Sequence, residues 1–354
     1  KGEKTDLGDI ANLQFSGDKQ ESGIFTITSD GTVYMKDRQS GFYTDKHEHS
    51  TKEVIIPSEI NGIKVKKLGD YMFCNYNSLE SVGIPDGITE IGNGVFCGCW
   101  EIANIVIPDN VKSIGKEAFS ECKKLTSVVI PDGVASIGDR AFTECSDLEN
   151  IKMSKNIQYV GDSAFAGTKW LKTLPDGLLY FGNTLYAYNG KIPQGTTIEI
   201  KDGVTNINGE AFSNQEGLIA IKIPDSVTSI EEYAFANCTK LASINIPDSI
   251  EYVGDQAFEG TAWLNNQNDG VVYIGKTLYC YKGEMPSNTT ITVKEETTNI
   301  SGLCFEGCTN LASITIPKSV TYIGMGAFFM CDNLKTINYK GSKEDWNNIT
   351  IEIQ

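Results

Sequence analysis

The stretch Val111–Ser127 reads VKSIGKEAFSECKKLTS, and Val134–Asn150 reads VASIGDRAFTECSDLEN. Val, Ile, Gly, Ala, Phe, Cys and Leu occupy the same positions in both stretches, 23 residues apart. Such a fixed period is typical of coils that stack on one another, because a single coil of this length cannot bury its own apolar residues. The recurrence therefore predicts a solenoid.

The phenylalanine of this unit recurs through most of the chain. Successive copies lie 23 residues apart, except for two steps of 47 residues, which equal two coils plus one residue. We therefore expect a solenoid over residues 51–340 that contains one atypical coil at each long step. The ten phenylalanines are Phe73, Phe96, Phe119, Phe142, Phe165, Phe212, Phe235, Phe258, Phe305 and Phe328.

The two atypical coils resemble each other. GLLYFGNTLYAYNGKIPQGTTIEI at 177–200 aligns with GVVYIGKTLYCYKGEMPSNTTITV at 270–293, an offset of 93 residues. Residue types alternate on both sides of a Gly-Asn or Gly-Lys pair, which is typical of a β-hairpin. We predict hairpin-type coils at about 170–200 and 263–293.

The path of a plain coil can be read from the repeat that begins at Leu125. Leu125, Val128 and Ile130 have the L-x-x-L-x-L spacing of a leucine-rich repeat strand. A Pro-Asp-Gly turn follows at 131–133. Asp139 then offers an N-cap oxygen to a helical turn, because apolar residues recur after it at a spacing near three. This predicts an α/β solenoid, a right-handed coil with one parallel β-strand and one short helical turn in each 23-residue repeat.

The two flanks do not follow the period. Residues 1–50 are rich in Lys, Asp, Gly and Ser, and we interpret them as an N-terminal flank and cap with a hairpin at Ile24–Met35. Residues 341–354 are interpreted as a C-terminal cap. His47 and His49, the only histidines, form an HEH triplet that could hold a metal. The triplet lacks further matched ligands, so we interpret it as part of a solvated loop.

The composition excludes several classes of function. Of the 354 residues, 40% are hydrophobic, which is enough for a packed core. The formal net charge of −16 repels nucleic acid phosphates and anionic lipids, so neither is an expected partner. No apolar run approaches the roughly 18–20 residues that span a bilayer, so we expect no membrane insertion. No credible Ser/His/Asp or Cys/His set and no phosphate-binding glycine pattern is present, so we expect no enzyme and no cofactor.

Two polar rows of the repeat were weighed as sites. Six cysteines share one repeat position that Thr takes in other coils, which favours packing over metal ligation. Cys74 and Cys97 follow the phenylalanines of adjacent coils and are the best disulfide candidates. The Pro-Asp turns stack carboxylates that could gather calcium, but their spacing is not that of a loop around one ion. We expect free thiols and no metal site. The six cysteines are Cys99, Cys122, Cys145, Cys238, Cys308 and Cys331, and the aspartates are Asp86, Asp109, Asp132, Asp225 and Asp248.

The repeat resembles a known family. The pattern IPDGV-x-x-IGD-x-AF-x-x-C-x-x-L is similar to the BspA-type leucine-rich repeats of bacterial surface and secreted proteins, over about residues 51–340. The resemblance implies export, a cell-surface or extracellular location, binding to host or neighbouring-cell proteins, and no enzyme activity. The printed residues begin at Lys1 and include no leader, so export rests on the resemblance alone. We expect a monomer.

The outward positions of the predicted strands are the first candidate binding surface. Val106, Val129, Lys152, Lys222 and Asn245 fall on one row of these positions, which is small, mixed and lightly charged for so acidic a chain. Val106 and Val129 facing outward would form a modest apolar patch for a protein partner. The alternative interpretation is an ordinary strand face without a ligand.

The aromatic residues of the atypical coils are the second candidate surface. Tyr188 and Tyr281 occupy equivalent positions in the two predicted hairpins. Alternate aromatic side chains could stack on sugars or anchor a protein. The alternative is that they seal an irregular coil.

Overall fold

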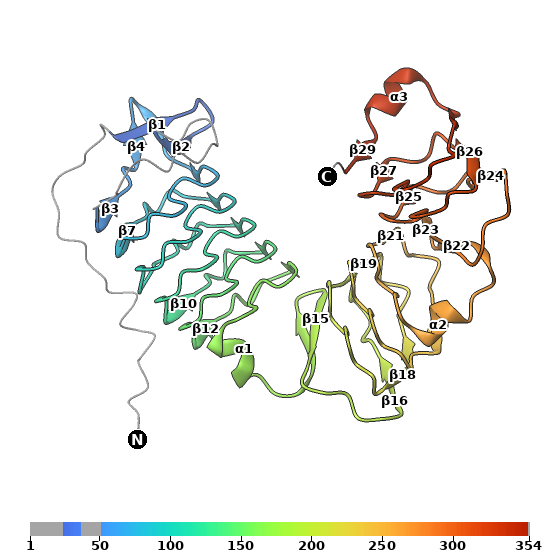
Figure 1. The fold of residues 1–354 in the computed structure, drawn as a ribbon. Coiled ribbons are helices and arrows are strands. Elements are labelled where there is room, and N and C mark those ends of the chain that lie inside the picture. Colours follow the sequence, from blue (N-terminus) through green and yellow to red (C-terminus); the bar gives the residue numbers. More distant parts are fainter. Residues whose placement is uncertain (1–23, 37–50, 353–354) are drawn as a thin grey trace. The chain divides into compact units, whose positions relative to one another are not determined.

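The computed structural model describes residues 24–36 and 51–352. The chain divides into two compact units, Lys1–Pro175 and Asp176–Gln354 (Figure 1). In each unit, coils stack so that short strands from successive coils pair in parallel. His47 and His49, with most of the predicted N-terminal cap, lie outside the described residues.

The longest ladder of the first unit is a seven-stranded sheet. Its first pair is an antiparallel hairpin, and every later neighbour pairs in parallel with a register of one coil. Val33 of the hairpin pairs with Leu68 of the first coil, so the described part of the flank continues the ladder. In order, the strands are β1 (Phe25–Ile27), β2 (Thr32–Met35), β6 (Lys67–Leu68), β8 (Glu90–Ile91), β9 (Ser113–Ile114), β11 (Ser136–Ile137) and β13 (Tyr159–Val160).

A second ladder in this unit uses the L-x-x-L-x-L segment. The prediction of one strand per coil is therefore wrong, because coils of this unit contribute to two parallel ladders. The sequence signal for the other strand is a two-residue Ser-Ile segment, too short to show alternation. The pairs are β3 (Glu53–Ile55) with β7 (Ser81–Gly83) and β10 (Ser127–Val129) with β12 (Asn150–Lys152), while β4 (Glu59–Ile60) and β5 (Ile63–Lys64) form a small antiparallel pair.

The predicted helical turn of each coil is also wrong. Arg140 and Glu144 have φ angles of 53° and 57°, which an α- or 3₁₀-helix does not allow. The N–H groups of Arg140, Phe142 and Glu144 donate to carbonyls of the next coil at 2.7–2.8 Å. Only the alternate residues make local turn bonds, such as the bond from Thr143 N–H to the Arg140 carbonyl at 3.1 Å. The spacing near three thus reflects a row of turns, each hydrogen-bonded to its neighbour.

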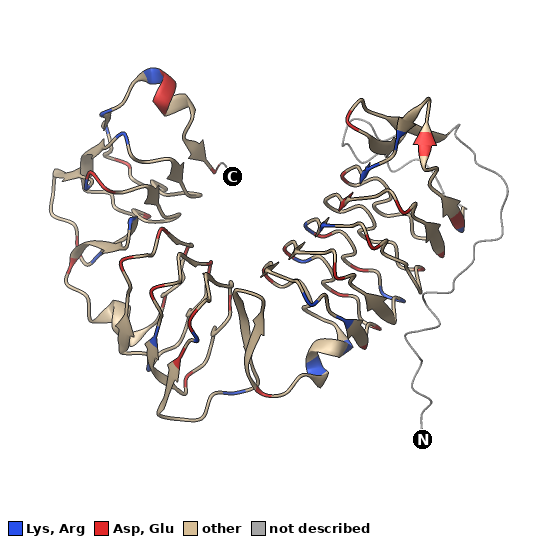
Figure 2. Cartoon of the chain, turned by 180° about the vertical axis from the view of Figure 1, so that it is seen from behind, with Lys and Arg blue, Asp and Glu red and all other residues tan. Residues whose placement is uncertain are grey.

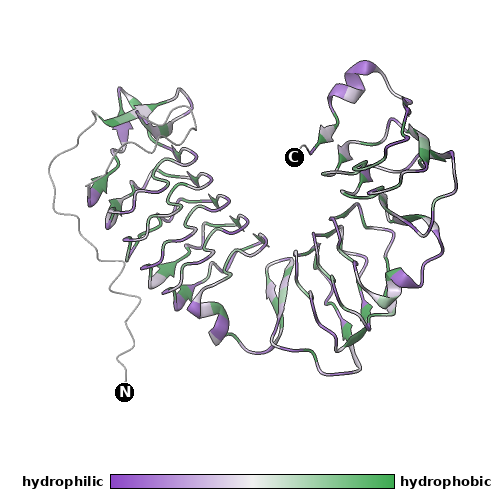
Figure 3. Ribbon diagram, viewed as in Figure 1, coloured by the Kyte–Doolittle hydropathy of each residue, from purple (hydrophilic) through white to green (hydrophobic). Residues whose placement is uncertain are grey.

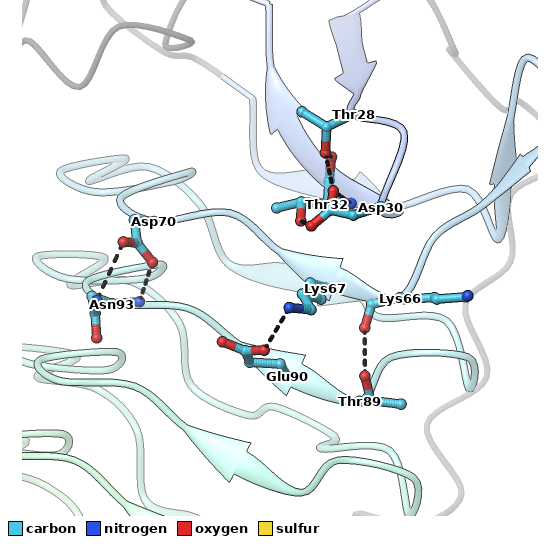
Figure 4. Close-up of polar contacts among 9 residues, drawn as sticks. All are labelled: Thr28, Asp30, Thr32, Lys66, Lys67, Asp70, Thr89, Glu90 and Asn93. Carbon is cyan, nitrogen blue, oxygen red and sulfur yellow. Dashed lines mark hydrogen bonds and ion pairs between the residues drawn. The ribbon is translucent and has the colours of Figure 1, made fainter.

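The Asp or Asn before these turns acts between coils, not as the predicted N-cap. The Asp70 carboxylate accepts a hydrogen bond from the Asn93 backbone N–H at 2.7 Å, one coil away (Figure 4). Asp139 accepts in the same way from the Asp162 N–H at 3.0 Å. These side chains extend the stacking of backbone groups to the surface.

The interior of the first unit is a column of five phenylalanine rings. Neighbouring rings stack with centroids 5.0–5.7 Å apart and interplanar angles of 5–18°, and all five side chains are fully buried. Tyr76 meets the first ring edge-on, and Trp170 of helix α1 (Lys169–Thr173) meets the last one at 67°. Hydrophobic and hydrophilic residues are interspersed along the coils, as the repeat pattern requires (Figure 3).

The second unit contains two blocks that repeat each other. Each block begins with an antiparallel strand pair, whose second strand then continues into a parallel ladder. The two five-stranded sheets are β14 (Gly177–Phe181), β15 (Thr184–Asn189), β17 (Asn206–Ile207), β19 (Ser229–Ile230) and β21 (Tyr252–Val253), then β22 (Gly270–Ile274), β23 (Thr277–Lys282), β25 (Asn299–Ile300), β27 (Tyr322–Ile323) and β29 (Thr350–Ile351).

Each block also has a three-stranded parallel sheet on its L-x-x-L-x-L segments. Helix α2 (Ala262–Asn265) precedes the second block, and α3 (Lys343–Asn347) follows its last coil. The sheets are β16 (Thr196–Glu199), β18 (Leu218–Lys222) and β20 (Ser243–Asn245), and β24 (Thr289–Thr292), β26 (Leu311–Ile316) and β28 (Thr336–Tyr339).

The second block joins the first through β23. Tyr279 is buried, and its hydroxyl accepts the backbone N–H of Phe258 at 2.8 Å. In plain coils the N–H of the repeat phenylalanine donates to a carbonyl of the next coil, so Tyr279 supplies the acceptor where no plain coil follows. The Tyr279 ring lies edge-on to Phe258 at 6.0 Å.

Candidate functional site

The structure brings two of the predicted outward residues together in the first unit. Val129 of β10 pairs with Lys152 of β12, and both line a hollow of about 300 Å³ with Asp109 and Asp132. Val129 is half-buried, whereas Lys152 is exposed and makes no ion pair with any residue that the structure describes. This hollow therefore combines an apolar wall with a free cation and two carboxylates.

Val106 is half-buried one coil before Val129. It is not among the residues that line the hollow. Two coils before the Val129 hollow, at the equivalent strand end, Ile55, Gly83 and Asp86 help to line a more open hollow of about 490 Å³. Hollows thus form in more than one coil where the strand meets the Pro-Asp turn.

Lys222 and Asn245 are neighbours in the second unit, on β18 and β20. Lys222 forms an ion pair with Glu199 at 3.5 Å, and both side chains are more than half exposed, so the pair is weak and its lysine is accessible. Asn245 is committed to structure: its amide accepts from the Ile223 N–H and donates to the Ile223 carbonyl, both at 2.8 Å. Of these two predicted site residues, only Lys222 retains its polar group for a ligand.

The hairpin tyrosines pack in the same way in both blocks. The Tyr188 ring lies 6.5 Å from Phe212 at 37°, and the Tyr281 ring lies 6.4 Å from Phe305 at 38°. Their backbone N–H groups donate to Ala211 and Cys304. Both tyrosines are half-buried, so each seals the start of a phenylalanine stack while leaving part of its ring accessible.

A pocket of about 490 Å³ lies beside Tyr281, where β23 follows the last coil of the first block. We call it the hairpin pocket and define it by Gln256, Glu259, Asn265, Tyr281, Lys282 and Glu306. Lys282 donates to the Gln267 carbonyl at 2.7 Å and lies 3.5 Å from Asp269. Burial raises the pKa of the Tyr281 phenol, which is therefore neutral near pH 7.

The cysteines lie in the core as free thiols. Four of the six in the shared repeat position are fully buried, and those of Cys122, Cys145 and Cys238 donate to the carbonyl of the preceding coil's phenylalanine at 2.9–3.3 Å. No disulfide joins Cys74 to Cys97; a hydrogen bond from Cys74, together with burial, raises the pKa of Cys97.

The turn carboxylates interact with neighbouring coils. Asp132 accepts from the Lys155 backbone N–H at 3.0 Å. Among the described residues, no three His, Cys, Asp or Glu side chains are grouped as a metal site would require. Acidic and basic residues are interspersed along the coils of each unit (Figure 2). None of the described helices has the length and apolar character needed to cross a membrane.

Comparison with protein families gives a match over most of the chain. A model of the BspA type leucine rich repeat region matches residues 66–193, 186–281 and 277–350. The chain belongs to the BspA-type leucine-rich repeat family. A comparison with curated proteins gives no match.

Solved structures similar to this BspA-type chain come from several bacteria. A leucine rich cell surface protein of Faecalibacterium prausnitzii is 27% identical, with 92% of this chain and 95% of that chain covered and a TM-score of 0.33. The leucine rich repeat protein of T. pallidum is 20% identical, with 68% and 86% covered and a TM-score of 0.36. The pneumococcal vaccine antigen PcpA is 17% identical, with 88% and 84% covered and a TM-score of 0.39. At these TM-scores the likeness adds nothing to the family match.

The hairpin pocket of this BspA-type chain was not found by sequence reasoning, apart from Tyr281. Gln256 and Glu259 come from a plain coil, and Glu306 comes from a coil 47 residues further along. The only signal in the sequence is that Glu259 and Glu306 follow the repeat phenylalanine, where other coils carry Cys, Ser, Thr or Ala.

Proposed function

We propose that the protein is a non-enzymatic interaction protein of the cell surface or extracellular space, which binds a host or neighbouring-cell protein through its strand faces. The family match supports this proposal, because stacked repeats present extended surfaces built on a rigid backbone. Family resemblance also implies the location. A monomer with no cofactor is part of the same proposal.

The observation that carries the proposal is the hollow at the strand end of the first unit. Val129 and Lys152 sit at fixed positions of a parallel ladder, so their geometry is set before any partner arrives. Protein interfaces combine an apolar centre with charged groups at the rim, and such preorganised sites lose little conformational entropy on binding. The exposed Lys222 offers a comparable cation in the second unit.

The test is a pull-down from host and community surface extracts with the wild-type chain and with charge-reversed variants. Lys152→Glu and Lys222→Glu should each reduce capture of the partner, because an attractive rim charge becomes repulsive. Both side chains are exposed, so the melting temperature should stay unchanged. Lys155→Glu is a matched control, since Lys155 is equally exposed but lies beyond the hollow. Capture that is equal in all variants would contradict the strand face as the binding surface.

Glycan binding through the aromatic hairpins is the second candidate function. The hairpin pocket favours it for Tyr281. For Tyr188 the observed contacts account only for sealing of the core.

A further inference from the structure

We infer that the hairpin pocket binds a single sugar ring, a neutral pyranose with several free hydroxyl groups. The inference deepens the second candidate function, because it names the ligand class and the residues of one site. It does not depend on the strand faces.

The pocket has the size and shape for a small ligand. Its volume of about 490 Å³ falls within the range of ligand pockets in proteins, roughly 300–1,000 Å³. Gly283 and Gly302 line it without side chains, so a ring can approach the backbone there. The Tyr281 ring is held by Phe305 from within the core, which fixes it as one wall. A fixed aromatic wall can stack against the apolar face of a pyranose.

The polar groups of the pocket combine donors with acceptors. Gln256 and Asn265 each carry an amide that donates and accepts, and Glu259 and Glu306 only accept. Lys282 has three N–H donors, of which the Gln267 carbonyl and the Asp269 carboxylate occupy two. Each hydroxyl of a sugar is both donor and acceptor, so it can satisfy all these groups.

A cationic ligand fits this set of groups less well. An ammonium or guanidinium group only donates, so it would leave the amide donors and the remaining N–H of Lys282 without partners. Lys282 would also repel the cation across the pocket. The two carboxylates alone would attract a cation, but the mixed set favours a neutral hydroxyl-rich ligand.

The sister hairpin supplies a matched control. Tyr188 has the position and ring packing of Tyr281, within 0.1 Å and one degree (6.5 against 6.4 Å, 37° against 38°). The residues 93 positions before Leu303 and Glu306 are Glu210 and Ser213, so the carboxylate that follows Phe305 has no counterpart there. Replacing either tyrosine by alanine should therefore lower the melting temperature alike, while only one change removes a pocket wall.

The experiment is saturation-transfer difference NMR on the full chain. The probes are the methyl glycosides of glucose, galactose, mannose and N-acetylglucosamine, each at millimolar concentration, with tetramethylammonium as the cationic probe. We expect saturation transfer to at least one glycoside. Tyr281→Ala should weaken that binding about tenfold or more, as loss of a stacking ring does, and Tyr188→Ala should leave it unchanged.

A second variant guards against loss of folding. Asn265→Ala removes an exposed amide from α2, so the fold should persist while sugar binding weakens severalfold. Absence of transfer to every glycoside would overturn the inference. So would equal weakening in Tyr188→Ala and Tyr281→Ala, or transfer to tetramethylammonium without transfer to a sugar. Loss of protein capture in Lys152→Glu with sugar binding intact would show that the two sites are independent.

Discussion

The first unit and the second unit bury the same residues in different ways. In the first, five phenylalanine rings form one uninterrupted column closed by Tyr76 and Trp170. In the second, a column of three rings and a column of two are separated by the hairpin β22–β23. The difference follows from the two 47-residue steps in the sequence, because a hairpin coil carries tyrosine where a plain coil carries phenylalanine.

The comparison teaches that interruption preserves the core but changes the surface. Tyr279 takes over both tasks of the missing plain coil: its ring covers Phe258 and its hydroxyl accepts the Phe258 N–H. The hairpin does not follow the outline of a plain coil, and the hairpin pocket forms where the two shapes differ. A uniform stack offers strand faces, whereas an interrupted stack also offers a pocket.

The largest expected effect is at the centre of the uninterrupted column. Phe142→Ala should lower the free energy of unfolding by about 3–5 kcal/mol, because Phe142 is fully buried between two rings and its loss leaves a cavity. Phe328→Ala should cost less, about 1–2 kcal/mol, since Phe328 is half-buried and stacks on one ring only. Urea unfolding followed by tryptophan fluorescence measures both. Equal costs would mean that position in the column has no effect.

An intermediate effect is expected at the interruption. Tyr279→Phe keeps the ring but removes the acceptor of a buried N–H, which should cost about 1–3 kcal/mol. Hydrogen exchange of the Phe258 amide should become faster in this variant. Tyr281→Phe is the control, since its ring is half-exposed and not part of this bond. Unchanged exchange at Phe258 in Tyr279→Phe would contradict the role given to the hydroxyl.

The smallest effect concerns the cysteine positions and alkaline pH. Burial raises the pKa of the Cys238 thiol from 9.0 to about 11. The folded protein therefore holds this proton more tightly than the unfolded chain does, so the contribution to stability is complete below about pH 9 and is lost as pH rises through about 11.

Cys238→Thr removes the titration and uses the residue found at positions 168 and 261. The melting temperature of this variant should fall less than that of the wild type between pH 8.5 and 11, about the interval of the raised pKa. A fall of equal size in both proteins would show that the thiol does not contribute.

Much of the core could be predicted from the sequence, but the backbone path of the coil could not. The buried phenylalanines and the shared cysteine position follow from the period alone, because stacked coils must place equal residues at equal depth. The segment around Phe142 shows a spacing of three that a helix also gives. What excludes the helix is the next coil, whose carbonyls at positions 162, 164 and 166 accept its N–H groups.

The candidate sites divide in the same way. Lys152 and Lys222 could be placed outside the core because alternate strand residues face opposite sides. The side-chain bonds of Asn245 to Ile223, and the meeting of Glu259 with Tyr281 at the hairpin pocket, could not be predicted. They depend on how neighbouring coils are offset, which one coil's residues do not specify.

The sequence by itself determined the period, the family, the buried columns and the positions of the two irregular coils. Each follows from which side chains must leave water, and that choice is written in every repeat. Only the tertiary structure decided that each coil is held by turns and two ladders without a helix, and that a pocket opens beside one hairpin. Backbone hydrogen bonds between coils fix both features, and their partners lie 20 or more residues apart.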